Sequence, residues 1–443
     1  MRRRGLVRAV MLALVVGAGT LAAAQPGVDW VAKTMGPFDS PETAQYAHVT
    51  LERTAANRLG GTWGPYTLVG SIEDFHIEFT LTDASGAEAG ALRGDIRDDY
   101  FIGHGSMIPA RRPGQTVAQP PIAVSWTLTR GAVAPAGHKT YDYEPVSYYG
   151  VYSAKEPPVL HIFPGDTVNT RTMDSARDAS IPRHGNGGDV NVGPFYVEGA
   201  LPGDTLVVKL IKIKPNKTVG RQGSRFNQYA VTQAYQLAAK YDPEFNGAWN
   251  QDVEKGVATL PATPGLPHLT IPLKPMLGCI SVAPAGEEQY RGTDLGPYGG
   301  NLDYNDNVAG TTLYFPVFHP GALLGMGDAH GAMGDGEVVG TGLETSVDVT
   351  FTVDVIKGYQ TPQVRAETDD YLISFGVSGS VPESIQLATT QLAEWMKKDY
   401  KLNDSEVALL FGDVLKYDIT ELVDPHFNVA AKVPKKVLAT LNK

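Results

Sequence analysis

Residues 346–356 read SVDVTFTVDVI and alternate between polar and apolar side chains as far as Val355. The apolar side chains of one face are Val347, Val349, Phe351 and Val353, and the polar ones of the other are Asp348, Thr350, Thr352 and Asp354. A period of two is that of an antiparallel strand with one face buried and the other in water. This stretch therefore predicts a sheet that covers an apolar core.

Similar short apolar or alternating runs recur along the chain between turn residues. They lie at 66–72, 75–82, 122–129, 159–163, 205–214 and 312–318. The 443 residues include 49 glycines and 31 prolines, which divide the chain into short segments as the turns of β proteins do. The sequence predicts a mainly β fold, with sheets that pack face to face or curl into barrels.

Helical patterns are concentrated near the C-terminus. Ser380 followed by Glu383 is the pattern of a helix N-cap with its capping box, and apolar residues then recur at helical spacing. Asn403 begins a second helix. We expect these two helices to form a hairpin that covers one edge or end of the β core. One further short amphipathic helix is expected within 220–262, a stretch that resembles an insertion.

The chain opens with MRRRGLVRAVMLALVVGAGTLAAAQP, a basic start followed by an apolar run and three alanines before Gln25. This is the pattern of a secretory signal peptide at residues 1–24, which is too short for a stable membrane anchor. We therefore expect an exported protein, periplasmic or secreted, with no stable membrane anchor.

A stretch rich in proline, glycine and alanine at 108–138 separates two parts of the chain. The first part, 27–135, is expected to form a β-rich N-terminal domain of unknown role, and the second part is the main domain at 138–443. Four aromatic residues of the first part are expected in its core rather than on a binding surface: Trp63, Tyr66, Phe75 and Trp126.

The composition excludes some functions. The formal net charge is −11, whereas a nucleic-acid-binding protein needs a basic face, so we expect no nucleic-acid partner. The single cysteine, Cys279, leaves no intrachain disulfide, and stability must come from the core or from assembly. Because the residues that flank it are apolar, we expect Cys279 to be a buried side chain rather than a nucleophile.

Three loops, at 183–208, 296–306 and 327–337, combine glycine with asparagine or aspartate. Such residues make either ordinary turns or sites where the backbone approaches a ligand closely. In the last loop, GDAHGAMGDGE, Asp328 and His330 project from the same face of an extended segment. Carboxylate and imidazole together are typical ligands of a catalytic divalent metal, zinc among them, although oxygen-rich ligation equally suits calcium, manganese or iron.

Six stretches beyond residue 138 match those of one enzyme family in order and spacing. They are PPVLHIFPGDTV (157–168), VGPFYVEGALPGDTLVVKL (192–210), ISVAPAG (280–286), GGNLD (299–303), LYFPVFHPGALLGMGDAHGAMGDGEVVGTGLE (313–344) and GDVLKYDITELVDPHFNVAAKVPKKVL (412–438). On these residues the chain resembles the acetamidase/formamidase family of metal-dependent amide hydrolases. The resemblance implies a β-rich fold with a late helical element, a homo-oligomer, and hydrolysis of small linear amides to carboxylate and ammonia.

The resemblance places the family's metal-site motifs at Asp303, His330 and Glu337, flanked by Asp328 and Asp335. We expect Asp303, Asp328, His330 and Glu337 to hold a divalent metal, zinc first, with calcium or manganese as alternatives. The implied reaction is attack of metal-activated water on the amide carbonyl, while a carboxylate moves a proton to the leaving nitrogen. Glu337 is the first choice for metal ligand or proton shuttle, and Asp335 is a further catalytic candidate.

Some features depart from the family. Tyr298 stands where some relatives have a histidine, so that ligand is absent or replaced by a phenol. His184 belongs to no family motif and is either a hydrogen-bonded loop residue or, as a catalytic candidate, a contact to substrate. Residues 27–135 have no family counterpart. Two rival functions stay open: a non-catalytic binding or structural protein on the same scaffold, and a hydrolase of lactams or other acyl bonds.

Overall fold

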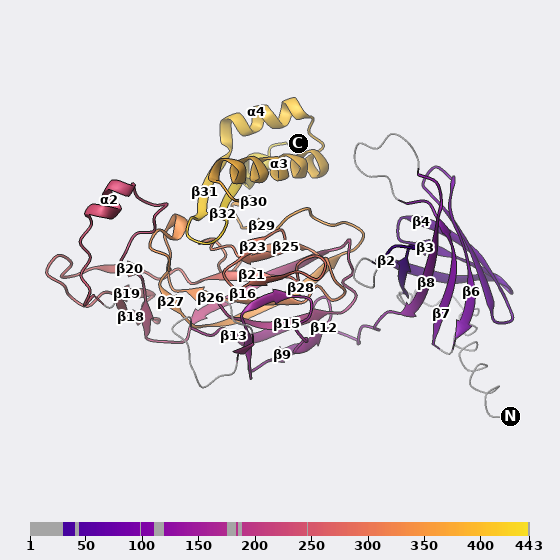
Figure 1. Ribbon diagram of the computed structural model, residues 1–443, viewed down its shortest axis with the longest axis horizontal. Coiled ribbons are helices and arrows are strands. Elements are labelled where there is room, and N and C mark those ends of the chain that lie inside the picture. Colours follow the sequence, from indigo (N-terminus) through magenta and orange to yellow (C-terminus); the bar gives the residue numbers. More distant parts are fainter. Residues whose placement is uncertain are drawn as a thin grey trace. The chain divides into compact units, whose positions relative to one another are not determined.

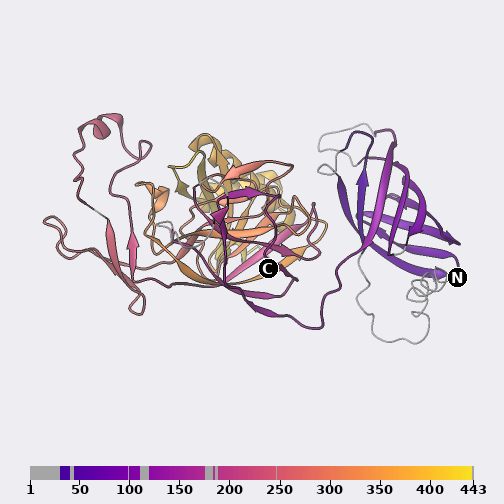
Figure 2. The same cartoon turned by 60° about the horizontal axis from the view of Figure 1, so that its bottom comes forward.

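The structure, a computed structural model, divides into two compact units that are described separately (Figures 1 and 2). One unit comprises Met1–Pro135 with Leu201–Gly203, and the other Ala136–Ala200 with Asp204–Lys443. The residues described are 30–39, 44–97, 99–109, 119–174, 183–184, 188–245 and 247–441. The expected signal peptide lies outside them. Within these ranges, no helix combines the length and the apolar character that a membrane span needs.

The first unit is a closed antiparallel barrel in which each strand pairs with the next and the last pairs with the first. Its strands are β1 (Trp30–Met35), β2 (Gln45–Ala55), β3 (Arg58–Trp63), β4 (Tyr66–Glu73), β5 (His76–Thr82), β6 (Glu88–Arg97), β7 (Tyr100–Met107) and β8 (Ile122–Arg130). Alternate side chains point inward, as the period-two patterns predict. The expected strands at 66–72, 75–82 and 122–129 are therefore confirmed.

Aromatic side chains fill the interior of the barrel. Trp63 and Trp126 are almost fully buried and meet edge to face, with ring centroids 5.8 Å apart. Tyr66 packs against the same core from a partly buried position. The expectation for Phe75 is wrong, because this residue is 49% exposed. Phe75 lies in the turn between β4 and β5, outside the alternation that directs side chains inward.

The second unit contains a nine-stranded sheet. In spatial order its strands are β31 (Lys416–Glu421), β32 (Phe427–Pro434), β30 (Tyr371–Ser378), β29 (Arg365–Glu367), β25 (Thr312–Pro316), β16 (Thr205–Pro215), β28 (Val347–Ile356), β13 (Thr167–Arg171) and β9 (Thr140–Asp142). β28 is the strand predicted from the alternation at 346–356. Val347, Val349, Phe351 and Val353 are all buried, as expected.

A thirteen-stranded sheet forms the other large layer of this unit. Its main path is β14 (Arg183–His184), β10 (Tyr148–Tyr149), β15 (Asn191–Val197), β26 (Leu324–His330), β27 (Glu344–Thr345), β17 (Val219–Arg221), β18 (Ala248–Asp252), β19 (Val257–Thr259) and β20 (Thr270–Pro272). Four more strands join off this path: β12 (Leu160–Ile162), β21 (Met276–Ser281), β23 (Leu295–Gly296) and β24 (Gly299–Asn301). A separate pair consists of β11 (Val151–Ser153) and β22 (Gln289–Arg291).

The two sheets share one apolar core. Phe195 of β15 and Phe351 of β28 meet with ring centroids 5.3 Å apart, which joins the faces of the two layers. Every residue of β26 and of β21 is buried, as in strands that are covered on both faces. The prediction of a mainly β fold is therefore confirmed. The second unit contains sheets that pack face to face, and the first unit is a barrel.

Helices lie near the end of the chain (Figure 1). They are α3 (Val381–Tyr400), α4 (Asp404–Val414) and α5 (Lys435–Leu438). α3 buries Leu392 and Met396 against β30 and β32, and α4 follows it, so the predicted helical hairpin is confirmed. The short helix expected within 220–262 is α2 (Gln233–Ala238), but none of its residues is buried, so it does not pack an apolar face.

The capping box of α4 gives a test of local stability. The side chain of Asn403 accepts a hydrogen bond from Glu406 N at 3.1 Å, and Glu406 accepts one from Asn403 N at 2.8 Å. Asn403→Ala should destabilise α4 by about 1 kcal/mol. Amide hydrogen exchange in α4 should then quicken roughly fivefold. Asn403→Asp keeps the acceptor and should exchange like the parent; equal exchange in the alanine variant would contradict a role for the cap.

Candidate metal centre

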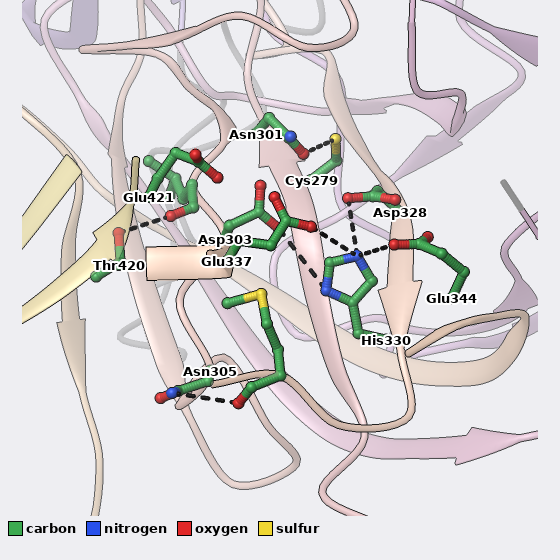
Figure 3. A network of polar contacts seen from close by, with 12 residues as sticks. Cys279, Asn301, Asp303, Asn305, Asp328, His330, Glu337, Glu344, Thr420 and Glu421 are labelled. Carbon is green, nitrogen blue, oxygen red and sulfur yellow. Dashed lines mark hydrogen bonds and ion pairs between the residues drawn. The ribbon is translucent and has the colours of Figure 1, made fainter. Parts of the chain in front are cut away.

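Acidic side chains and one imidazole gather in the second unit (Figure 3). The cluster, which we call the acid cluster, consists of Asp303, Asp328, His330, Glu337, Glu344 and Glu421. All of its members are buried, and none is more than 7% exposed. Such burial of ionisable groups is rare unless they are paired or hold an ion.

Several elements bring the acid cluster together. Asp328 and His330 lie on β26, where they reach the same side, as their spacing predicts. His330 pairs in register with Glu344, the first residue of β27. Glu337 ends the short 3-10 helix η1 (Asp335–Glu337). Asp303 lies just beyond β24, and Glu421 ends β31. The cluster thus depends on pairing between strands that are far apart in the sequence.

His330 lies at the centre of these contacts, with the acids around it (Figure 3). Its Nε2 is 3.1 Å from Glu344 Oε1, 3.3 Å from Asp328 Oδ2 and 3.9 Å from Glu337 Oε1. Its Nδ1 is 3.8 Å from Asp303 Oδ1. Two ligand atoms on one tetrahedral zinc ion lie roughly 3.4 Å apart, given bond lengths near 2.1 Å. The spacing within the cluster is therefore that of atoms that can share an ion.

Three overlapping sets of ligand atoms meet this condition. Within each set the atoms lie within 4.8 Å of one another, and the sets are Asp303 with Asp328 and His330, His330 with Glu337 and Glu344, and Asp303 with Glu337 and Glu421. A further set joins Asp328 to Asp189 and Cys279. His330, Asp303 and Glu337 each belong to two sets, so they form the middle of the cluster.

Many polar atoms of the acid cluster lack a hydrogen-bond partner. These buried atoms are both carboxylate oxygens of Asp303, both ring nitrogens of His330, Oε2 of Glu344 and Oε2 of Glu421. In the part of the chain that the structure describes, no lysine or arginine forms an ion pair with any acid of the cluster. Burying several acids around a single imidazole is costly, and a divalent cation would satisfy the atoms that lack a hydrogen-bond partner.

The electrostatics of the cluster follow from this arrangement. Burial, followed by the charges of Glu337 and Asp328, raises the pKa of Asp303 well above its usual value. Burial also raises the pKa of Glu337 well above its usual value. For His330, burial alone lowers the pKa, but the charges of Glu344 and Asp328 outweigh it and the pKa is well above the usual value. The site therefore favours added positive charge.

Three residues of the acid cluster have a backbone conformation that is unfavourable in free energy. Asp303, Asp328 and Glu337 have φ angles of 42°, 45° and 45°, in the left-handed region that residues with a Cβ seldom adopt. Such conformations cost of order 1–3 kcal/mol each and concentrate at functional sites. Three of the four metal ligands expected from the sequence thus adopt a conformation that the surrounding structure must hold.

The absence of a side chain at Gly278 leaves a space between the carboxylates of Asp303 and Asp328. A Cβ on Gly278 of β21 would lie 2.6 Å from Asp328 Oδ2 and closer still to Asp303 Oδ1. A Cβ on Gly342 would fall on the ring of His330. Any side chain at Gly278 would therefore occupy the space between two carboxylates. The carboxylate oxygens and ring nitrogens without hydrogen-bond partners, their spacing and this space indicate that the residues present fit a divalent metal.

The structure brings together four residues expected as metal ligands, Asp303, Asp328, His330 and Glu337. It does not bring in Asp335, which is exposed and accepts a hydrogen bond from Asn305 at 2.7 Å. The catalytic role of Asp335 stays a prediction, and the structure places this residue outside the acid cluster. The reason is local: Gly336 has a φ of 79°, and with Glu337 also left-handed the chain turns one acid inward and the other outward.

Other expected residues lie elsewhere. The backbone of His184 is part of β14 and pairs with β10, while its side chain lies outside the described residues. Cys279 is fully buried, as expected, and its thiol donates to Asn301 Oδ1 at 2.7 Å. Burial raises the pKa of that thiol well above its usual value, so it stays protonated. Tyr298 is buried between Tyr152 and Tyr290, with ring centroids 5.5 and 5.2 Å away.

Sequence reasoning missed two members of the cluster, Glu344 and Glu421. Both lie inside stretches that carry the family resemblance, 313–344 and 412–438. In each stretch, the signal available in the sequence was an acid next to an apolar strand.

The stretch 220–262, which resembles an insertion, also reaches the site: Asn227 N donates to Val338 O at 2.8 Å, next to Glu337. This contact helps to cover η1.

Solved structures show the class of the fold. A recombinant predicted acetamidase/formamidase from Thermoanaerobacter tengcongensis superposes with a TM-score of 0.59 and 27% identity, over 69% of this chain and 99% of that one. An acetamidase from Bacillus halodurans gives a TM-score of 0.59 and 26% identity, over 68% and 100% of the two chains. The fold of the second unit is thus that of solved acetamidases.

Sequence comparison agrees with the structures. The model of the acetamidase/formamidase family matches residues 286–368, which include every acid-cluster member except Glu421. An acetamidase of Mycolicibacterium smegmatis is 24% identical over 44% of this chain, which spans only 59% of that relative. A formamidase of Methylophilus methylotrophus is 23% identical over 60% of this chain and 83% of its own length. The resemblance to the acetamidase/formamidase family is therefore confirmed, and these relatives are named as amide hydrolases.

Proposed function

We propose that this protein is an exported, metal-dependent amidase that hydrolyses the carbon–nitrogen bond of a small linear amide to a carboxylate and ammonia. The observation that carries the proposal is the acid cluster, a buried imidazole among carboxylates that no lysine or arginine of the described residues neutralises, and all of its members except Glu421 lie within the stretch that matches the family. Amides of the formamide or acetamide class are the substrates, as in the names of the relatives. Export by residues 1–24 and assembly as a homo-oligomer are part of the same proposal.

Asp303, Asp328 and His330 would hold the metal, zinc first with calcium or manganese as alternatives, and Glu337 would be either a further ligand or the proton shuttle. Glu344 would support His330 from 3.1 Å. When bound, such an ion lowers the pKa of a water molecule and polarises a carbonyl. Burial of the cluster keeps other water away and strengthens each electrostatic interaction there.

Glu337 is the residue to which we assign proton transfer. Its carboxylate belongs to two of the ligand sets, and it lies on the short helix η1 rather than within a large sheet. A carboxylate in this position can take a proton from the attacking water and pass it to the leaving nitrogen. Glu421 completes one of those sets and holds its own carboxylate by accepting from Asp424 N at 3.1 Å.

The test is ammonia release from formamide, acetamide, longer linear amides and lactams, combined with elemental analysis of the purified protein. We expect about one equivalent of a divalent metal per chain and turnover of the short amides. Removal of the metal with a chelator should lower the turnover at least about tenfold, and zinc should restore it. Metal-loaded protein that turns over no compound of the panel would overturn the enzyme proposal, and turnover of lactams alone would replace linear amides as the substrate.

A further inference from the structure

A chemically distinctive cavity lies in the same unit as the acid cluster, between helix α3 and the outer face of the nine-stranded sheet. Its volume is about 530 Å³, within the range of sites for small molecules. Arg365 and Tyr314, which face each other across β29 and β25, contribute to its sheet side. Trp395 and Lys398 contribute from α3, which packs along this sheet in Figure 1. The cavity shares no lining residue with the acid cluster.

Arg365 is the unusual residue of this cavity. It is only 6% exposed, and its Nε is buried without a hydrogen-bond acceptor. The centre of its guanidinium lies 4.1 Å from the ring of Trp395 and 5.7 Å from each of the rings of Tyr314 and Tyr359. These rings stabilise the cation, and Tyr359 also forms a side-chain hydrogen bond with it, but Nε is left without an acceptor. Burial lowers the pKa of Arg365, against the influence of Tyr359 and Asp399.

The acids of the cavity already have partners. Glu367 pairs with Lys435 at 2.6 Å and accepts from the hydroxyl of Tyr314 at 3.0 Å. Asp399 accepts from the indole of Trp395 at 2.7 Å. Across the described ranges, neither Arg365 nor Lys398 forms an ion pair with an acid. Two cations without an acidic partner therefore face a cavity that has aromatic walls.

We propose that this cavity is a binding site for a small organic carboxylate with a flat apolar body. The planar fork of Arg365 matches a carboxylate, and Lys398 adds a second positive charge at the mouth. Lys398 Nζ lies against the ring of Tyr359 and Arg365 against the ring of Trp395, so the apolar body would contact the parts of the Tyr314, Tyr359 and Trp395 rings that the two cations leave uncovered. Glu367 and Asp399 disfavour ligands with two or more negative charges, so a monoanion fits better than phosphate.

Calorimetric titration of the full-length protein with sodium benzoate tests the proposal. We expect saturable binding of benzoate at millimolar concentration or below, and no comparable binding of inorganic phosphate or acetate. Lys398→Gln, an exposed substitution that should leave the fold intact, is expected to weaken binding about tenfold. Arg365→Gln should abolish binding if that variant folds.

Lys397→Gln is the matched control. Lys397 is the neighbour of Lys398 on α3 but pairs with Glu394 at 3.1 Å and Asp404 at 2.9 Å, away from the cavity. The control should bind benzoate like the parent protein. Absence of saturable benzoate binding, equal affinity for phosphate or acetate, or an unchanged affinity in Lys398→Gln would each overturn the proposal. None of these measurements depends on amidase turnover.

Discussion

Substitution of Glu337 by glutamine is expected to lower kcat/KM for ammonia release by about a thousandfold. Glutamine keeps the size of the side chain but cannot accept and return a proton, and it removes one negative charge from two of the ligand sets. The carboxylate of Glu337 lies 3.9 Å from His330 Nε2 in a buried site, so bulk water cannot replace it. Steady-state kinetics on the best short amide, together with metal content, measure the effect.

Asp335→Asn is the control for this substitution. Asp335 lies two residues before Glu337 in the same turn, but it is exposed and bonded to Asn305. Loss of its charge should leave turnover within about threefold of the parent, since surface changes of this kind have small effects. If Asp335→Asn lost as much activity as Glu337→Gln, the assignment of the inward-facing acid would be wrong.

The local parts of the fold could be predicted from the sequence because their causes are local. The alternation at 346–356 depends only on neighbouring residues, and so do the helix caps at Ser380 and Asn403. The pairing of the strands is not local. β26 pairs with β15, β21 and β27, and the residues of β26 alone do not predict which strands pair with it. Phe75 shows the same limit, since the turn that exposes it interrupts an otherwise regular pattern.

The acid cluster was predictable in part for similar reasons. The family motifs and the spacing of Asp328 and His330 identified four residues that the structure brings together. Glu344 was missed because its approach to His330 arises from the register of β26 with β27. Asp335 lies outside the acid cluster, which GDGE does not reveal because it offers two acids, and the left-handed conformation of Gly336 and Glu337 decides which one faces inward.

Substitution of Gly278 by alanine should damage the site without removing any of its ligands. The new methyl group would lie 2.6 Å from Asp328 Oδ2, nearer to Asp303 Oδ1, and 2.9 Å from the backbone oxygen of Asp328. Real contacts of a Cβ with oxygen are longer, so the carboxylates or the β21–β26 pairing must move. Overpacking of this kind typically costs about 1–3 kcal/mol. We expect loss of bound metal and at least a hundredfold lower turnover, by roughly the magnitude that small misplacements of catalytic groups cause.

Gly334→Ala distinguishes this effect from a general intolerance of alanine near the site. Gly334 precedes η1, has a φ of −86°, and offers open space to a Cβ. Its alanine variant should keep both metal and turnover. Elemental analysis, ammonia release and circular dichroism on both variants separate loss of the site from loss of the fold. A folded Gly278→Ala protein with full metal content and parental turnover would show that the space between Asp303 and Asp328 does not hold the ion.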